Sequence, residues 1–212
     1  MKQIQLSVNG QAYAFPVRTG VEASHQDDWH KTVETTLQRY LQVFPEEATR
    51  LQRLSGDLAS DAAASRGLSS RGIFPGHITG SGIVVEAGRA LLIRHPIIGR
   101  WLQPGGHLEG NELPDSAAER EAEEETGWRV APVIDGQGTP MLLDIDIHAI
   151  PENSKKGEPA HWHYDFLYVF APLEKVTTPE LPVKWVDIAD IDEPRLLGAL
   201  AKLPKLHASL SA

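Results

Sequence analysis

Residues 105–128 read GGHLEGNELPDSAAEREAEEETGW, and this stretch decides how the rest of the chain is interpreted. Between positions 119 and 125 it holds five glutamates, with Arg120 as the only cation. Pro114 suits the first turn of a helix, Asp115 favours the positive end of the helix dipole, and Gly127 can take the left-handed conformation that ends a helix. The stretch therefore predicts a helix over residues 114–126.

Three of these glutamates share one face of the predicted helix. Glu121, Glu124 and Glu125 are three and four residues apart, which places their carboxylates about one turn apart. Like-charge pairs at these spacings cost about 0.2–0.5 kcal/mol each, so an ordinary solvated helix tolerates a few of them. Charge repulsion therefore does not exclude an ordinary solvated helix. Clustered carboxylate oxygens are, however, also the ligands that Mg²⁺ and Mn²⁺ prefer, so a metal site is the alternative.

The patterns around this stretch predict an α+β fold with helices on both faces of a mostly antiparallel or mixed sheet. Alternating apolar residues flank Asn9-Gly10 and predict a hairpin, and helical spacing predicts helices over 29–44 and 51–62, followed by a linker over 62–72. Strands are predicted over residues 77–85, 90–94, 141–150, 161–170 and 183–186, and a closing helix around 194–203.

The composition restricts the possible functions of the chain, which has 212 residues, a net charge of −9 and no cysteine. Through Gly72 there are eight basic and eight acidic residues, and the remainder holds twelve and twenty-one, so the acidic surplus lies with the glutamate stretch. Without clustered Lys and Arg we expect no nucleic-acid polymer as partner. Missing cysteine excludes disulfides and thiolate sites. No run approaches the roughly 18 apolar residues of a membrane helix, so we expect no membrane partner and a cytoplasmic protein.

The spacing of the fixed residues carries a family resemblance. Gly106 is followed by Glu112 after five residues and, seven residues later, by the run REAEEETGW. This resembles the signature of the Nudix hydrolase superfamily, G-x5-E-x7-R-E-U-x-E-E-x-G-U, where U is a bulky aliphatic residue. All seven fixed positions match, which chance produces in about one in a million chains of this length. Ala122 and Trp128 depart only at the looser positions, and Leu113 stands where Ser or Thr often caps the helix.

The resemblance implies a metal site on the predicted helix. Mg²⁺ or Mn²⁺ would be bound by the carboxylates of Glu121, Glu124 and Glu125, with the carbonyl of Gly105 as a further ligand. Arg120 would orient the carboxylates, and we take Glu124 as the candidate general base, so Arg120, Glu121 and Glu124 form the expected catalytic set. The structural residues of the motif would be Gly106, Glu112 and Gly127.

The resemblance also implies a fold and a domain organisation. Residues 73–193 would form a Nudix domain, an α/β/α sandwich around a mixed sheet. Residues 1–72 would be an N-terminal extension made of the hairpin, two helices and the linker, and residues 194–212 a C-terminal helix packed on the domain. Glu119 and Glu123 fall on positions that the motif leaves free, and we expect them to be solvated.

The reaction implied is hydrolysis of a pyrophosphate bond in a small-molecule nucleoside diphosphate derivative, such as a nucleotide sugar or ADP-ribose. A bound metal makes this hydrolysis chemically feasible, because it offsets the negative charge of the phosphates and lowers the pKa of a bound water. The alternative is a non-catalytic Nudix-fold module that binds a nucleotide, which the intact glutamates disfavour. A third alternative, isomerase chemistry on a prenyl diphosphate, is disfavoured because the familiar form of that enzyme has a cysteine-bearing site and this chain has no cysteine. The resemblance also allows a homodimer.

Two predicted strands carry a second group of polar side chains. Alternation along each strand places three of these side chains on one face. They are Asp144, Asp146 and His148 on the first strand, and His161, His163 and Asp165 on the second. The two strands would line one polar pocket that contacts phosphate or metal or supplies a base, and ordinary polar positions on a half-solvated sheet face are an equal alternative. His77 is interpreted as a strand residue, and His107 as acting at most through other residues.

Overall fold

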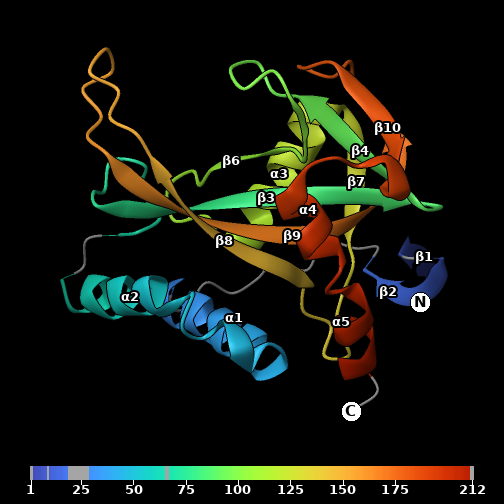
Figure 1. Cartoon of the computed structure of the whole chain (residues 1–212), viewed down its shortest axis with the longest axis horizontal. Coiled ribbons are helices and arrows are strands. Elements are labelled where there is room, and N and C mark those ends of the chain that lie inside the picture. The colour runs from blue at the N-terminus through green and yellow to red at the C-terminus, as the bar shows by residue number, and fades with distance from the viewer. Residues whose placement is uncertain (1, 9, 19–28, 65–66, 211–212) are drawn as a thin grey trace.

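The computed structural model of the protein describes residues 2–8, 10–18, 29–64 and 67–210 (Figure 1). The strands of its central sheet are β3 (Gly76–Glu86), β4 (Arg89–Arg94), β5 (Trp101–Leu102), β6 (Gly105–His107), β7 (Trp128–Pro132), β8 (Leu142–Ile150), β9 (His161–Lys175) and β10 (Val183–Asp187). Five are neighbours in the order β10-β4-β3-β9-β7, and β5, β6 and β8 pair with β4, β3 and β9. The central pair β3 and β9 is parallel and the others are antiparallel, so the sheet is mixed.

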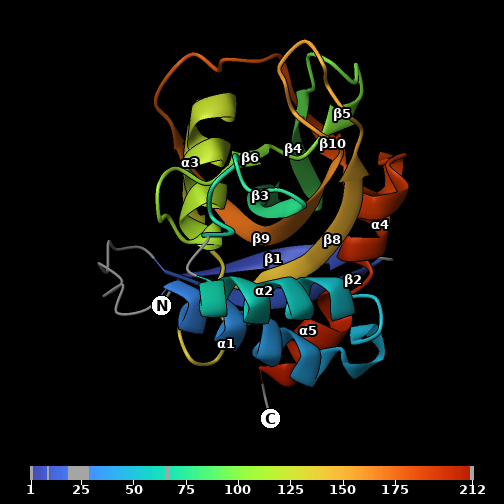
Figure 2. The same ribbon diagram turned by 90° about the vertical axis from the view of Figure 1, so that its left-hand side faces the viewer.

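Helices cover both faces of this sheet. Figure 2 shows α3 (Pro114–Thr126) on one side of the strands and α4 (Pro194–Leu200) on the other. The predicted α+β class, with an α/β/α sandwich around a mixed sheet, is confirmed.

The glutamate-bearing helix α3 lies close to the sheet because both surfaces are made of small residues. Ala117, Ala118 and Ala122 on the helix have no exposed surface, and the first two lie against glycines in the middle of β3. A Cβ added at Gly80 would lie 2.9 Å from the backbone nitrogen of Ala118 and would overlap the carbonyl oxygen of Pro114. The helix backbone therefore occupies the space that a side chain at Gly80 would need.

The N-terminal part contains the predicted hairpin and helices. Strands β1 (Lys2–Val8) and β2 (Gln11–Val17) form a separate antiparallel sheet, and Asn9 of the predicted turn lies outside the described residues. They are followed by α1 (Trp29–Val43), the short helix η1 (Pro45–Glu47) and α2 (Gln52–Ala64). These elements lie below the sheet in Figure 2, next to α5 (Leu203–Ser209), and their buried side chains join the same hydrophobic cluster as the sheet.

Two predicted boundaries in the terminal regions differ from the structure. The predicted linker begins inside a helix, since α2 continues to Ala64, and beyond it Leu68 is buried and its carbonyl accepts a hydrogen bond from the amide of Ile78. The predicted closing helix is two helices, α4 and α5. Pro204 in the first turn of α5 has no N–H to continue a helix from α4. None of the helices in the described ranges is long and apolar enough to cross a membrane.

The strand predictions missed β7 and the two short strands β5 and β6, and they ended β9 too early. β7 follows α3 directly, and β9 continues past the predicted end at Phe170 to Lys175 because β7 pairs with its last part. Pro172 is accommodated there because the β7–β9 register shifts between Arg129 and Val130. β7 therefore forms the surroundings of the face of α3 that lies opposite Glu121, Glu124 and Glu125.

Candidate active site

The bounds of α3 are set by the residues that the sequence indicates. Pro114 occupies the first turn, and Gly127 at the C-terminus has a φ of 72°, with its amide donating to the carbonyl of Glu123. A Cβ at Gly127 would lie 2.5 Å from the carbonyl oxygen of Thr177, so this position needs glycine for space as well as for conformation. The preceding residue, Leu113, provides no side-chain cap.

Arg120 connects the preceding loop to the glutamate face of α3. Its guanidinium donates to both carboxylate oxygens of Glu112, at 3.2 and 3.0 Å, and to the carbonyl of His107 at 3.0 Å. It also donates to Glu121 at 2.8 Å and Glu124 at 3.2 Å. The arginine is therefore placed to orient two of the carboxylates, and Glu112 holds the loop against the helix.

The short strand β6 lies against the remaining carboxylates. The amide of Gly105 donates to Oε2 of Glu125 at 3.0 Å. A Cβ at Gly106 would lie 2.5 Å from Cδ of Glu121, so the carboxylate occupies the space that any side chain at Gly106 would fill. The two glycines thus allow the Glu121 and Glu125 carboxylates to meet one stretch of backbone.

The carboxylates of this face carry more negative charge than their surroundings balance. Burial raises the pKa of Glu125 to about 7, with the Gly105 amide opposing the shift and the Glu121 carboxylate adding to it. Burial also raises the pKa of Glu121, although Arg120 opposes this. A raised pKa means that added positive charge would stabilise the ionised form. The hard oxygen donors and the unbalanced charge fit a divalent cation such as Mg²⁺ or Mn²⁺.

A cavity of about 280 Å³ lies next to the β6 backbone that Glu121 and Glu125 contact, although these glutamates are not among its lining residues. On one side it is lined by β6, through Gly105, Gly106 and His107. On the other side it is lined by five of the six polar residues predicted on the two strands, namely Asp144, Asp146, His148, His163 and Asp165. The structure brings these residues together because β8 and β9 are antiparallel, with Asp146 opposite Asp165 and His148 opposite His163.

Asp165 is a partly buried carboxyl held by two hydroxyl groups. Thr79 donates to Oδ1 at 2.9 Å and Ser81 donates to Oδ2 at 2.5 Å, both from the neighbouring strand β3. Burial raises the pKa of Asp165, and the two hydroxyl donors oppose the shift. The sequence interpretation did not include Thr79 or Ser81, because their contact with Asp165 depends on the parallel pairing of β3 with β9.

The two aspartates of β8 are engaged in ion pairs. Asp144 accepts from the ammonium group of Lys202 at 2.6 Å, beside the start of α5. Asp146 accepts from Arg195 at 2.5 Å and contacts His148 at 2.8 Å. Burial raises the pKa of Asp146, but His148 and Arg195 bring it down to about 2. These pairs attach the C-terminal helices to the rim of the cavity.

His161 does not line the cavity but lies behind His163. Its ring centroid is 5.2 Å from that of His163 and 5.0 Å from that of His77, and the His77 and His163 centroids are 4.7 Å apart. Burial, and then the neighbouring His77 and His107, lower the pKa of His163 to about 2. The imidazole of His163 is therefore neutral at physiological pH, and sequence reasoning missed the association with His77.

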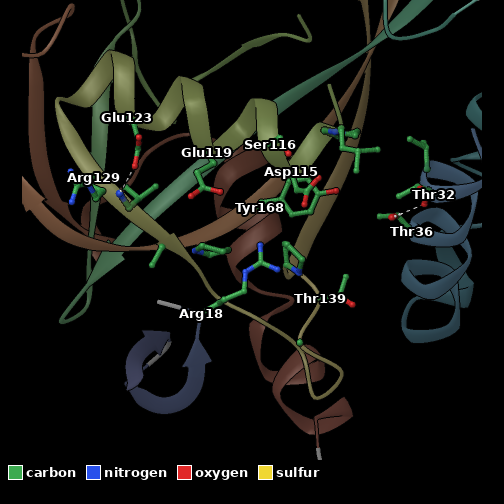
Figure 3. Close-up of a pocket in the computed structure, with 18 of the residues that line it drawn as sticks. Arg18, Thr32, Thr36, Asp115, Ser116, Glu119, Glu123, Arg129, Thr139 and Tyr168 are labelled. Atoms are coloured by element: carbon green, nitrogen blue, oxygen red, sulfur yellow. Dashed lines mark hydrogen bonds between the residues drawn. The ribbon is translucent and has the colours of Figure 1, made fainter. Parts of the chain in front are cut away.

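The opposite face of α3 borders a larger cavity of about 780 Å³ (Figure 3). Glu119 and Glu123 line it, together with Arg18 and Arg129. The prediction that both glutamates are solvated is wrong, since each is partly buried and Glu123 accepts a hydrogen bond from the amide of Val130 at 3.0 Å. The cause is β7, which returns along the helix and covers this face.

Glu119 makes the stability of the protein depend on pH. Burial, and then the Glu123 carboxylate, raise its pKa from 4.5 to about 7. Because the folded protein holds this proton more tightly than the unfolded chain, the free energy of unfolding is highest below pH 4.5 and decreases as the pH rises to about 7. We expect Glu119→Gln to match the wild type at pH 4.5 and to be about 1–2 kcal/mol more stable at pH 8, after allowing for solvent screening. Urea unfolding at the two pH values measures this, and an equal difference at both would contradict it.

Comparisons with known proteins agree with the site's sequence pattern. A family model described as NUDIX domain matches residues 76–206. The chain is 31% identical over 117 residues to a probable DHNTP pyrophosphohydrolase of Lactococcus lactis, covering 55% of this chain and 67% of that protein. It is 40% identical over 62 residues to the phosphatase NudJ of Escherichia coli K12, covering 28% of this chain and 40% of that protein.

A solved NUDIX-family hydrolase from Clostridium perfringens is 29% identical, with a TM-score of 0.41, covering 60% of this chain and 97% of that one. The family match begins at the first residue of β3 and includes all of α3.

Proposed function

The chain belongs to the Nudix family, and we propose that it is a divalent-metal-dependent pyrophosphohydrolase acting on a nucleoside diphosphate linked to another moiety. The names of its relatives, a pyrophosphohydrolase and a phosphatase, support hydrolysis of phosphate compounds. The chain spans about two thirds of the first relative and two fifths of the second, so substrate and metal are part of the proposal.

One observation carries the proposal: the carboxylates of Glu121 and Glu125 meet the Gly105–Gly106 backbone at the edge of a polar cavity. Together with Glu124 they would hold Mg²⁺ or Mn²⁺, with the carbonyl of Gly105 as a further ligand. When bound, such a metal supplies positive charge to the pyrophosphate and acidity to the attacking water.

The residues of this chain then divide the remaining work. Arg120 positions the carboxylates of Glu121 and Glu124 through the hydrogen bonds described above. Among the three carboxylates that Arg120 contacts, Glu124 is the most exposed, at 51%, and it is the proposed general base that takes the proton of the attacking water. Glu112, Gly106 and Gly127 hold the loop and helix in place.

A substrate panel tests the proposal. The purified protein is incubated with nucleoside diphosphate sugars, ADP-ribose, dinucleoside polyphosphates, nucleoside triphosphates and DHNTP, each with and without Mg²⁺ or Mn²⁺. Products are separated by chromatography, and we expect metal-dependent cleavage of at least one pyrophosphate bond. No turnover of any compound, combined with tight binding of one, would instead identify a non-catalytic nucleotide-binding module.

A further inference from the structure

Three imidazoles converge at the start of the parallel strand pair. His77 on β3 lies opposite His163 on β9, and His161 is two residues earlier on the same face of β9. One nitrogen from each ring can be chosen so that all three lie within 4.8 Å of one another. His77 and His161 are buried, with 1% and 5% of their surface exposed, and His163 is partly buried.

Backbone carbonyls fix the tautomers of the two buried histidines. Nδ1 of His77 lies 3.3 Å from the carbonyl oxygen of Ile73, and Nδ1 of His161 lies 2.7 Å from that of Pro159. A carbonyl oxygen only accepts hydrogen bonds, so in both rings the proton is on Nδ1 and Nε2 carries a lone pair. The Nε2 atoms of His161 and His163 are 3.3 Å apart, so without a metal Nε2–H of His163 donates a hydrogen bond to the Nε2 lone pair of His161. A metal ion between the rings would take the place of that proton, with His163 in its other tautomer.

The Nε2 atom of His77 is unsatisfied. It is a buried polar atom that finds no hydrogen-bond partner among the described residues. Buried acceptors are normally paired, and an orphan at this position calls for a donor or a cation. A fully buried lone pair facing two further imidazoles is the arrangement that a metal ion would satisfy.

We propose that His77, His161 and His163 bind one Zn²⁺ ion or a chemically similar divalent transition metal. Neutral imidazole with its other nitrogen bonded to a carbonyl is a preferred ligand of such ions, whereas Mg²⁺ prefers oxygen. The site uses none of the α3 carboxylates and does not depend on the proposed hydrolysis, although His163 and His107 also line the cavity next to Gly105 and Gly106. His107, whose ring centroid is 5.1 Å from those of His77 and His163, is the candidate fourth ligand.

Cobalt binding tests this site. Co²⁺ is titrated into chelator-treated protein that carries Glu121→Gln, Glu124→Gln and Glu125→Gln, so the carboxylate face cannot contribute. We expect one equivalent to bind with the visible absorption of a nitrogen-coordinated ion and to be displaced by Zn²⁺. Adding His163→Ala is expected to weaken binding at least about a hundredfold, since even the loss of an outer partner of a metal ligand costs about 10–100-fold. His207→Ala is the matched control, because His207 is equally a partly buried histidine but packs against Tyr13 and Phe15.

A second readout needs no histidine variant. The protein with the three glutamate substitutions and all its histidines is loaded with one equivalent of Zn²⁺. X-ray absorption then counts the imidazole ligands of the ion directly, and we expect at least three. Fewer than three imidazoles, no stoichiometric binding of Co²⁺, or undiminished binding in a folded His163→Ala variant would each overturn the proposal. Failure of the substrate panel would leave these results unchanged, so the two proposals can fail independently.

Discussion

Glu124→Gln is expected to lower kcat by about 10²–10⁴-fold on whichever panel compound is cleaved, with the fold retained. The carboxamide has nearly the shape of the carboxylate, and its oxygen can still accept the hydrogen bond that Arg120 now donates at 3.2 Å. It cannot take a proton from the attacking water. Steady-state kinetics with a saturating metal concentration measure the loss, and circular dichroism checks the fold.

The neighbouring substitution Glu123→Gln provides the control. Glu123 is on the other face of α3, and its contact is the amide of Val130 at 3.0 Å, which a glutamine oxygen can also accept. We expect kcat within about twofold of the wild type, as for a change away from the reacting groups. Equal losses in the two variants would contradict the assignment of the metal face, and no loss in either would exclude Glu124 as the base.

Gly80→Ala is expected to cost about 3 kcal/mol of folding free energy, at the upper end of the range for overpacking. The new methyl group would lie 2.9 Å from the backbone nitrogen of Ala118 and overlap the carbonyl of Pro114, so α3 must move away from β3. For a protein of this size the loss corresponds to a drop in Tm of about 6–12 °C. Because α3 carries the three glutamates that we propose bind the metal, we expect activity to fall together with stability.

Gly56→Ala is the matched control for this change. Gly56 is exposed inside α2, and an added Cβ there meets nothing within 4 Å. We expect a gain of about 0.5–1 kcal/mol, because alanine favours a helix interior over glycine. Calorimetry on both variants decides the matter, and a Tm of Gly80→Ala equal to the wild type would contradict the close packing of α3 on β3.

The sequence predicted α3 and its glutamate face because the signals that define them are local. Pro114, Gly127 and the glutamates all lie within one short stretch of sequence. In the structure Pro114 occupies the first turn of α3, and Gly127 ends the helix in the left-handed conformation. The contacts of Arg120 with Glu112 and Glu121 follow from the same stretch. Alternation along β8 and β9 likewise sufficed to bring Asp146 and Asp165 to one cavity.

The features that sequence reasoning missed depend on pairing between distant segments. Nothing near His77 indicates that β3 will run parallel to β9, and it is this pairing that places it beside His161 and His163. Glu119 and Glu123 were expected to be solvated because β7 was not predicted, and β7 is what encloses them. The pairing of Asp144 with Lys202 joins β8 to the C-terminal helices and has no local signal.

The most direct test of the account is the metal dependence of hydrolysis by the wild-type protein. The rate on the best panel compound is measured as purified, after removal of divalent ions with a chelator, and after Mg²⁺ or Mn²⁺ is added back. We expect the rate to fall to background on chelation and to be restored by the added metal. Hydrolysis that continues unchanged after chelation would contradict a metal site on the Glu121, Glu124 and Glu125 face as the basis of the activity.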